Sequence, residues 1–455
     1  MRLMGEGTTF RRSLHVDVRD DALSPFGGLV LLREFEERTA FLARFLAGLV
    51  DPRRACQAVH GLATLLRFAV YRIVLGLPDV MDAERLRHDP VLRACLSPES
   101  GDRLPGPLAG KSTLHRFLTR ILTLRPNRRV LWRGLVDSAL HPLLARKRKV
   151  KRVYVDMDST EIEVHGEQQG AVNNGHFRSV CYHALSLSLA PYGTTLGVLL
   201  RPGNVHTAHH ALAFVLPLLF MIRERLGTKV EIVLRADSGF ASPKIYRTLE
   251  KHGFFYVIRM GENARLLRAC ARIRKRQRGR PPEQRSAFRH YGFSYKAGGW
   301  KHHRRIVARS AFAPGELLPD WTFLCVHLPT REARRRVVRT YLARCRSEQV
   351  HDIFKNEMHG SLMSHHRLVD NQVRAWLTAL AKNLLLAFEL HVRGREAAAR
   401  PATVRARILC VAASFVRHAR SLVMRLSAGP ALANLLRRAG ARVAEATPVP
   451  LLGGA

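Results

Sequence analysis

The sequence predicts an α/β fold in which a β-rich segment interrupts a three-layer core, with helical regions at both ends. Three observations predict it. Apolar residues recur at helical spacing through the first third of the chain, β-rich alternation begins at Val153, and strands then alternate with helices. Apolar residues make up 47% of the 455 residues, which allows a sizeable core and suggests two or three domains.

The chain is strongly basic. Lys and Arg total 75 against 36 Asp and Glu, and the formal net charge of +39 is spread over every segment. A polyanion is therefore the natural partner, with nucleic acid as the first candidate. A membrane partner is not expected, because the longest apolar run, residues 211–222, is too short to cross a bilayer. The seven Cys are scattered without C-x-x-C spacing, which argues against disulfides and zinc and fits a cytoplasmic protein.

The first 150 residues are expected to form a flexible N-terminus, 1–28, and a helical region, 29–150. Helices are expected at 29–50, 58–75, 82–93, from 112 onward, and at 125–141. Ser112 is a suitable N-cap for the fourth of them. The basic run 146–152 is expected to be a linker that is either solvated or in contact with phosphate.

The core is expected to comprise residues 151–263 and 337–392. Its strands are expected at 153–158, 161–164, 179–189, 196–200, 230–237 and 254–259, with helices at 207–226 and 243–252. Later strands are separated by helices, as parallel crossovers require, and the overall order is that of a ribonuclease H-like sheet. A long helix, 371–392, is expected to close the core.

Two further segments flank the second half of the core. Residues 264–336 are expected to be a β-rich insertion, with a basic loop at 274–285 and strands at 286–295, 304–313 and 321–327. Residues 393–455 are expected to be a basic helical tail with a loose end.

Three acidic motifs lie at the ends of predicted strands or on a predicted helix. Asp156-Met-Asp158 ends the first strand, Asp237 ends a later parallel strand, and Glu348 lies on helix 337–355. In α/β sheets functional groups gather at the carboxyl ends of strands, and the first strand and the strand that ends at Asp237 are neighbours in this order. Three carboxylates that lie close together stay ionised only beside positive charge. Two Mg²⁺ ions roughly 4 Å apart would supply that charge and would support phosphoryl transfer. Asp158 is the preferred ligand because it lies nearer the strand end, with Asp156 as the alternative.

The predicted helix 337–355 has two different faces. A phenol, a carboxylate and two cations fall within roughly 60° of one another: Tyr341, Glu348, Arg344 and Lys355. The opposite side is apolar and can dock on a core, with Val350, Ile353 and Phe354. A carboxylate in this company suits a metal ion, and the cations suit a phosphate.

The spacing of these four residues resembles the DDE transposases of bacterial insertion sequences, in the class marked by a Tyr-x2-Arg-x3-Glu-x6-Lys (YREK) signature. Further matching motifs are Asp156-x-Asp158-Ser-Thr160, Asn174-Gly-His-Phe177, Leu200-Arg-Pro-Gly-Asn204, Arg235-Ala-Asp237-Ser-Gly-Phe240, Asn371, Ala381-Lys-Asn-Leu384, Leu86-Arg-His-Asp-Pro90 and Leu108-Ala-Gly-Lys-Ser-Thr113. The resemblance covers about residues 50–425. Cys345 and Lys382 depart from it, because a Gly and an aromatic residue are expected there.

The resemblance implies a catalytic triad and its metal. The triad would be Asp158, Asp237 and Glu348, holding two Mg²⁺ ions with Mn²⁺ as a substitute. DNA phosphates near a flipped terminal base would be held by Tyr341, Arg344 and Lys355. The insertion usually supplies an aromatic side chain for that base, and Trp300 and Trp321 are the candidates, although a Trp more commonly belongs to the core.

The resemblance also implies an activity and its partners. The enzyme would cut donor DNA at terminal inverted repeats through a hairpin, join it to target DNA, and act as a homodimer in the bacterial cytoplasm at the nucleoid. Two alternatives stay open: a nuclease of the same fold that only hydrolyses DNA, and a non-catalytic DNA-binding descendant.

Overall fold

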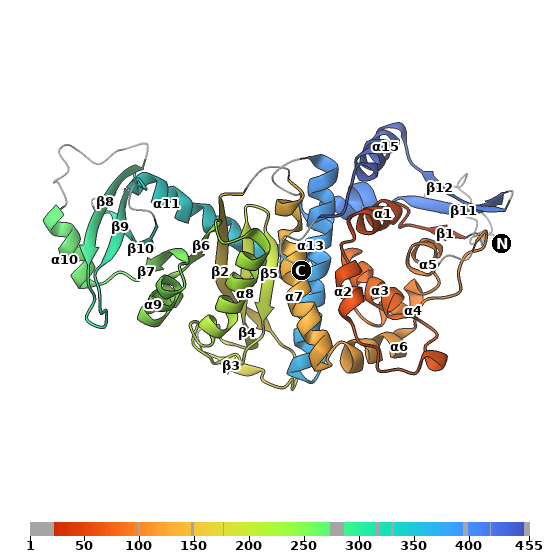
Figure 1. The fold of residues 1–455 in the computed structure, drawn as a ribbon, viewed down its shortest axis with the longest axis horizontal. Helices are drawn as coiled ribbons and strands as arrows, with labels where there is room; N and C mark the ends of the chain where they lie inside the picture. Colours follow the sequence, from red (N-terminus) through yellow and green to blue (C-terminus); the bar gives the residue numbers. More distant parts are fainter. Residues whose placement is uncertain are drawn as a thin grey trace, which may run out of the picture.

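The computed structural model describes residues 22–449, apart from 99–100, 147–149, 176, 274–285, 315, 317, 329–331, 395–398 and 419. The molecule is elongated, with a helical half at one end and a large sheet that runs from the middle to the strand-rich other end (Figure 1). No helix within the described ranges is long and apolar enough to cross a membrane.

A mixed nine-stranded sheet runs through the molecule. Its strands are β2 (Arg152–Glu163), β3 (Val172–Asn174), β4 (Ser179–Ala190), β5 (Thr194–Leu199), β6 (Glu231–Ala236), β7 (Phe255–Met260), β8 (Ala287–Tyr295), β9 (Arg304–Phe312) and β10 (Asp320–His327). The order is β3-β4-β2-β6-β7-β10-β9-β8, and β5 pairs with β4. Strand β2 is parallel to β6, and β6 is parallel to β7. The predicted adjacency of the first core strand and the strand that leads to Asp237 is therefore confirmed.

Strand β2 is longer than expected. The sequence predicts separate strands at 153–158 and 161–164, whereas the structure has one strand of 12 residues, so neither Asp156 nor Asp158 ends it. Pairing with β6 stops at Met157 opposite Ala236. Asp158 lies one residue beyond this pair, and Asp237 follows directly after β6. Both residues therefore lie one position past the end of the β2–β6 pairing.

Helices cover both faces of the sheet (Figure 1). On one face α8 (Ala211–Leu226) and α9 (Pro243–Lys251) pack against an apolar layer that includes Val153, Val155 and Met157. Because side chains alternate along a strand, Asp156 and Asp158 face the other way. That opposite face is covered by α11 (Arg334–Leu342), α12 (Arg346–Asp352) and α13 (Leu368–Arg393).

The N-terminal region is helical, as predicted. Its elements are α1 (Leu29–Thr39), α2 (Ala43–Gly48), η1 (Ala55–Gln57), α3 (Leu62–Val74), α4 (Asp82–Leu86), α5 (Pro90–Leu96), α6 (Lys111–Arg116), η2 (Phe117–Ile121, a π-helix) and α7 (Arg125–Leu144). The first expected helix breaks at Ala40, which is left-handed with φ 53°. The third breaks before Pro90, where the Asp89 carboxylate caps α5. Gly110, not Ser112, is the N-cap of α6.

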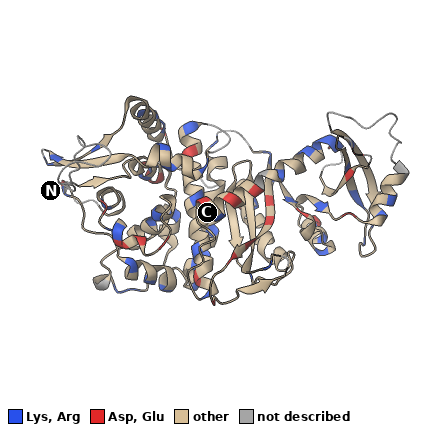
Figure 2. Ribbon diagram, turned by 180° about the vertical axis from the view of Figure 1, so that it is seen from behind, with Lys and Arg blue, Asp and Glu red and all other residues tan. Residues whose placement is uncertain are grey.

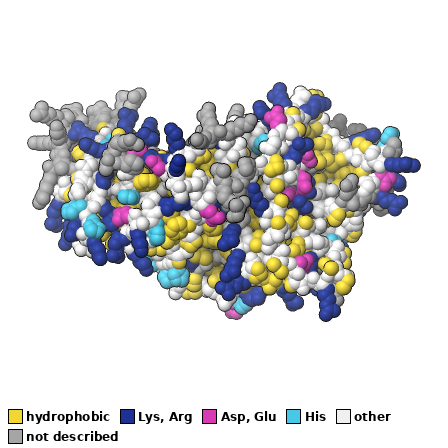
Figure 3. Space-filling model, viewed as in Figure 1, with side chains coloured by type: hydrophobic (Ala, Val, Ile, Leu, Met, Phe, Trp, Pro, Cys, Tyr) yellow, Lys and Arg dark blue, Asp and Glu magenta, His cyan; other side chains and the backbone are white. Residues whose placement is uncertain are grey.

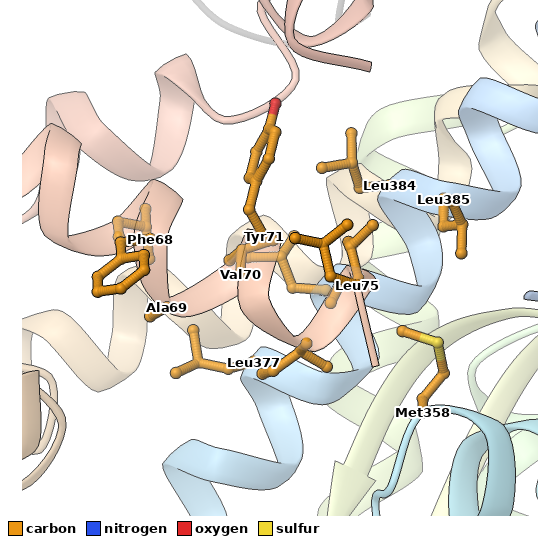
Figure 4. Packing of buried hydrophobic residues seen from close by; sticks show 14 of the residues in the cluster. Phe68, Ala69, Val70, Tyr71, Leu75, Met358, Leu377, Leu384 and Leu385 are labelled. Carbon is orange, nitrogen blue, oxygen red and sulfur yellow. The ribbon is translucent and has the colours of Figure 1, made fainter. Parts of the chain in front are cut away.

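Helix α3 fixes this region to the rest of the molecule by packing against α13. Figure 4 shows the contact, in which Phe68, Val70 and Leu75 lie near Leu377 and Leu384. These side chains are almost fully buried, and each contributes roughly 1.5–3 kcal/mol of apolar burial. Helix α13 therefore joins the helical half to the sheet face that carries Asp158.

The segment expected to be an insertion contains α10 (Ala264–Ile273) and the three predicted strands, β8, β9 and β10. They do not form a separate sheet, because β10 pairs antiparallel with β7 and extends the core sheet outward. The expected basic loop at 274–285 lies outside the described residues.

The C-terminal tail is not wholly helical. After α14 (Pro401–Val404) and the π-helix η6 (Arg405–Leu409), a hairpin of β11 (Ala412–His418) and β12 (Ser421–Ser427) precedes α15 (Pro430–Ala444). Along β12, half-buried residues alternate with exposed ones, which is a strand period rather than a helical one. Strand β11 also pairs with β1 (Leu23–Ser24). Part of the segment expected to be flexible is thus held in a sheet, and residues 1–21 lie outside the described part.

Candidate active site

A pocket of about 460 Å³ lies where β2 and β6 meet the segment that follows α11. Its lining includes five of the residues predicted from the sequence: Asp158, Asp237, Arg344, Glu348 and Lys355. Asp158 and Asp237 come from neighbouring parallel strands, and the other three come from the helical segment on that face of the sheet. Acidic residues mark the central strand β2 in Figure 2, whereas Lys and Arg are spread over both ends of the molecule.

Arg344 lies between the two Asp carboxylates. Its Nη2 is 3.0 Å from Asp158 Oδ2 and 3.7 Å from Asp237 Oδ2, and it donates to the Met157 carbonyl at 3.2 Å. Burial raises the pKa of Asp237, and repulsion from Asp158 acts in the same direction while Arg344 opposes it. Burial acts to lower the pKa of Arg344, but the surrounding carboxylates outweigh it and raise that pKa above its ordinary value. In this conformation one guanidinium lies beside both Asp carboxylates and offsets one of their two negative charges.

The segment that carries Arg344 is not the single helix that the sequence predicts. Helix α11 gives way to a 3₁₀ turn, η4 (Ala343–Cys345), then to α12 and to a π-helix, η5 (Ile353–Glu357). Tyr341 belongs to α11, before this 3₁₀ turn, and the other three signature residues follow from η4 onward. Tyr341 is only 9% exposed, packs against Val337 and Val338, and does not line the pocket. Ile353 and Phe354 are buried, as expected.

Asp156 is held away from the pocket by a buried ion pair. Its two carboxylate oxygens accept from Arg235 Nε at 2.6 Å and Nη2 at 2.7 Å, and the side chain is 5% exposed. Arg235 also donates to the Thr340 carbonyl at 2.6 Å. The pair therefore links β2, β6 and the end of α11, just before Arg344. This geometry favours Asp158 over Asp156 as the ligand.

Sequence reasoning missed His351 and Arg235. His351 Nε2 lies 3.7 Å from Asp158 Oδ2 and 3.1 Å from Ser186 Oγ. Burial lowers the pKa of His351 to about 4, although Asp158 opposes the shift, so the imidazole is neutral at pH 7. Its position three residues after Glu348 on one helix was the available signal. For Arg235 the signal was its place two residues before Asp237 on the same strand.

Lys355 and the two tryptophans complete the set of predicted residues. Lys355 Nζ lies 3.9 Å from Glu161 Oε1 at the edge of the pocket. Trp300 is 6% exposed and packs edge-to-face against Tyr246, so no free ring face is available to a base. Trp321 is half-buried on β10 and stacks on Phe323. Neither Trp lines the pocket.

The carboxylates of the pocket are of the type that binds a divalent cation, but their positions do not form a metal site. Three carboxylates line the pocket, and Mg²⁺ prefers oxygen ligands. Within the described residues, however, no three His, Cys, Asp or Glu side chains lie close enough together to hold a metal ion. The expectation that all three carboxylates lie within metal-bridging distance is thus not met in this conformation. Arg344 stands between two of them and Glu348 is exposed, so a divalent ion must either displace Arg344 or bind beside its positive charge.

Comparison with known proteins shows the family to which the chain belongs. A family model described as "Transposase DDE domain group 1" matches residues 6–448. Among solved structures, the chain is similar to a piggyBac transposase in a synaptic complex with hairpin DNA, determined by cryo-EM, with 12% identity and a TM-score of 0.42. That similarity covers 83% of this chain and 78% of the other. No curated protein matches the chain.

Proposed function

The chain belongs to the transposase DDE domain group 1 family, and from this premise we propose that it performs cut-and-paste transposition of an insertion sequence. The substrates are the terminal inverted repeats of the element and a target DNA. The chemistry is strand nicking, hairpin formation at the element end, and strand transfer. The observation that carries the proposal is the pocket in which Asp158, Asp237 and Glu348 occur together with Arg344 and Lys355.

We propose a ribonuclease H-like core for this enzyme. The strand order β5-β4-β2-β6-β7, with β2, β6 and β7 parallel and the others antiparallel, supports it. The catalytic Asp residues then belong to adjacent central strands, and Glu348 belongs to the helical segment that follows the insertion. Residues 29–150 are the proposed DNA-binding region.

Each residue of the pocket has a distinct proposed role. Asp158, Asp237 and Glu348 would hold two Mg²⁺ ions, or Mn²⁺ in their place. Bound there, the metal would activate the attacking hydroxyl and stabilise the leaving oxygen. Arg344 and Lys355 bind DNA phosphates and orient the strand. Arg235, through Asp156 and the Thr340 carbonyl, holds β2 and the end of α11 in register.

A strand-transfer assay tests this function. The full-length chain is incubated with Mg²⁺, a labelled duplex that ends in a pre-cut 3′-hydroxyl of the inverted repeat, and a plasmid target. The proposal expects joined product, and it expects a hairpin from an uncut duplex. Nicking without joined product would identify a simple nuclease, and duplex binding without either product would identify a non-catalytic DNA-binding protein.

A further inference from the structure

Two open pockets on the helical half share one arginine. One, of about 870 Å³, lies between residues 52–60 and α6, and the other, of about 720 Å³, lies between η2 and residues 364–370. Arg120 lines both. We call this pair of pockets the α6 groove. It is separate from the pocket that holds Asp158, with which it shares no lining residue.

The α6 groove carries positive charge that the described protein does not neutralise. Arg54, Arg116 and Arg120 are exposed, and none of them has an acidic partner within ion-pair distance among the described residues. The two carboxylates of the lining are already bound. Glu84 accepts from the Lys111 N–H at 2.7 Å, and both oxygens of Asp370 accept from Arg367.

The cations are presented on a rigid element. Arg116 and Arg120 are four residues apart on the continuous α6–η2 segment, so they project from the same side. The other side of this segment is buried in the main apolar core through Leu114, Phe117 and Ile121. The helix backbone that carries the two arginines is therefore fixed before an anion binds, although their exposed side chains still lose rotamer freedom on binding.

The chemistry of the lining matches a phosphodiester backbone. Arginines stand beside the hydroxyls of Ser112 and Thr113, which are the groups that commonly contact DNA phosphates. Single-stranded nucleic acid is usually held by exposed aromatic rings that stack on bases. The one Phe, Tyr or Trp in the described lining, Phe117, is 1% exposed. The groove therefore suits the backbone of a duplex.

We infer that the α6 groove binds the phosphate backbone of duplex DNA beside the element end and fixes the duplex relative to the catalytic pocket. The inference rests on the proposed function for the identity of the DNA, and it adds the surface and the residues that hold it. Arg116 and Arg120 each contact one phosphate. The contacts position the duplex and do not read its sequence.

The test compares two variants of equal charge change. Arg116→Gln/Arg120→Gln removes two cations from the groove. Arg247→Gln/Lys251→Gln removes two exposed cations from α9, on the strand-rich side of the molecule (Figure 1). Binding of a labelled inverted-repeat duplex to the full chain is measured by fluorescence anisotropy from 50 to 400 mM salt, after circular dichroism and thermal melting have confirmed folding.

Two lost phosphate contacts reduce the slope of log K against log[salt] by about 1.8 and weaken binding about 60-fold at 0.1 M salt. The groove variant is expected to show both effects, while the α9 variant stays within about threefold of wild type. Equal losses in the two variants would overturn the inference. A wild-type chain that binds the duplex but never cuts it would overturn the proposed function while leaving the groove assigned.

Discussion

Replacing Arg344 by Gln should make the catalytic pocket bind divalent metal more tightly when DNA is absent. The guanidinium stands 3.0 Å from Asp158 and 3.7 Å from Asp237, where a cation shared by the two carboxylates would lie. A metal ion must therefore either displace Arg344 or bind beside its positive charge. Gln keeps hydrogen-bonding capacity but removes the charge, so both costs fall.

The size of the effect follows from either route. A divalent ion about 5 Å from the guanidinium would be repelled by about 1.7 kcal/mol at the dielectric of water and about 6.6 kcal/mol at an effective dielectric of 20. Displacing Arg344 instead breaks charge-assisted hydrogen bonds worth roughly 1.5–3 kcal/mol each. The smaller of these figures corresponds to a gain of about tenfold in affinity.

Mn²⁺ binding to the DNA-free chain, followed by electron paramagnetic resonance of free Mn²⁺, measures this gain. Lys355→Gln is the matched control, because Lys355 lines the same pocket but lies beside Glu161 rather than between the two Asp residues. The reasoning predicts at least tenfold tighter binding in Arg344→Gln and a markedly smaller change in Lys355→Gln. Unchanged or weaker Mn²⁺ binding in Arg344→Gln would refute it.

Three further predictions concern stability and are read by thermal melting. Burial lowers the folded-state pKa of His351 and of His365 to about 4, so between pH 6.5 and 4 the unfolded chain binds more protons than the folded chain. The free energy of unfolding should therefore fall on acidification through that window, by about 3 kcal/mol per His. The His365→Gln variant should show a smaller fall. Burial lowers the pKa of Lys382 to about 7, so the free energy of unfolding should rise between pH 7 and 10.5 by up to about 5 kcal/mol. Lys382→Met should abolish that rise and raise the melting temperature at pH 7. A lower melting temperature for Lys382→Met would contradict this prediction. Arg235→Met leaves Asp156 buried and unpaired, and it should lower the free energy of unfolding by about 3–5 kcal/mol. Adding Asp156→Asn to the same chain should restore part of this loss. If Arg235→Met alone is as stable as wild type, the pair does not hold β2 and α11 together.

Much of the fold could be predicted because strand and helix periods are local. The β-rich alternation after Val153 and the apolar run before Asp237 predict two strands, and their parallel pairing places Asp158 beside Asp237. The same reasoning predicts the three strands of the insertion to within a residue or two.

What could not be predicted depends on tertiary contacts. The extension of the core sheet by β10 and the pairing of β11 with β1 join segments far apart in the chain. The 3₁₀ turn at residues 343–345 interrupts the single helix that the spacing predicts. Arg344 contacts both Asp158 and Asp237 in the folded chain, and the spacing of residues in the sequence does not indicate which carboxylates an arginine will contact. Lys and Arg occur at several places on the face shown in Figure 3, as their spread along the sequence predicts.

Cleavage of an inverted-repeat duplex by Glu348→Gln, measured beside its binding to the same duplex, tests the central claim most directly. The matched control is Asp352→Asn, a carboxylate of the same pocket that is bound to Arg400 at 2.7 Å. We expect Glu348→Gln to abolish nicking and hairpin formation while duplex affinity stays close to that of wild type, and Asp352→Asn to cut normally. Cleavage that persists in Glu348→Gln would show that this pocket is not the site of DNA strand cleavage.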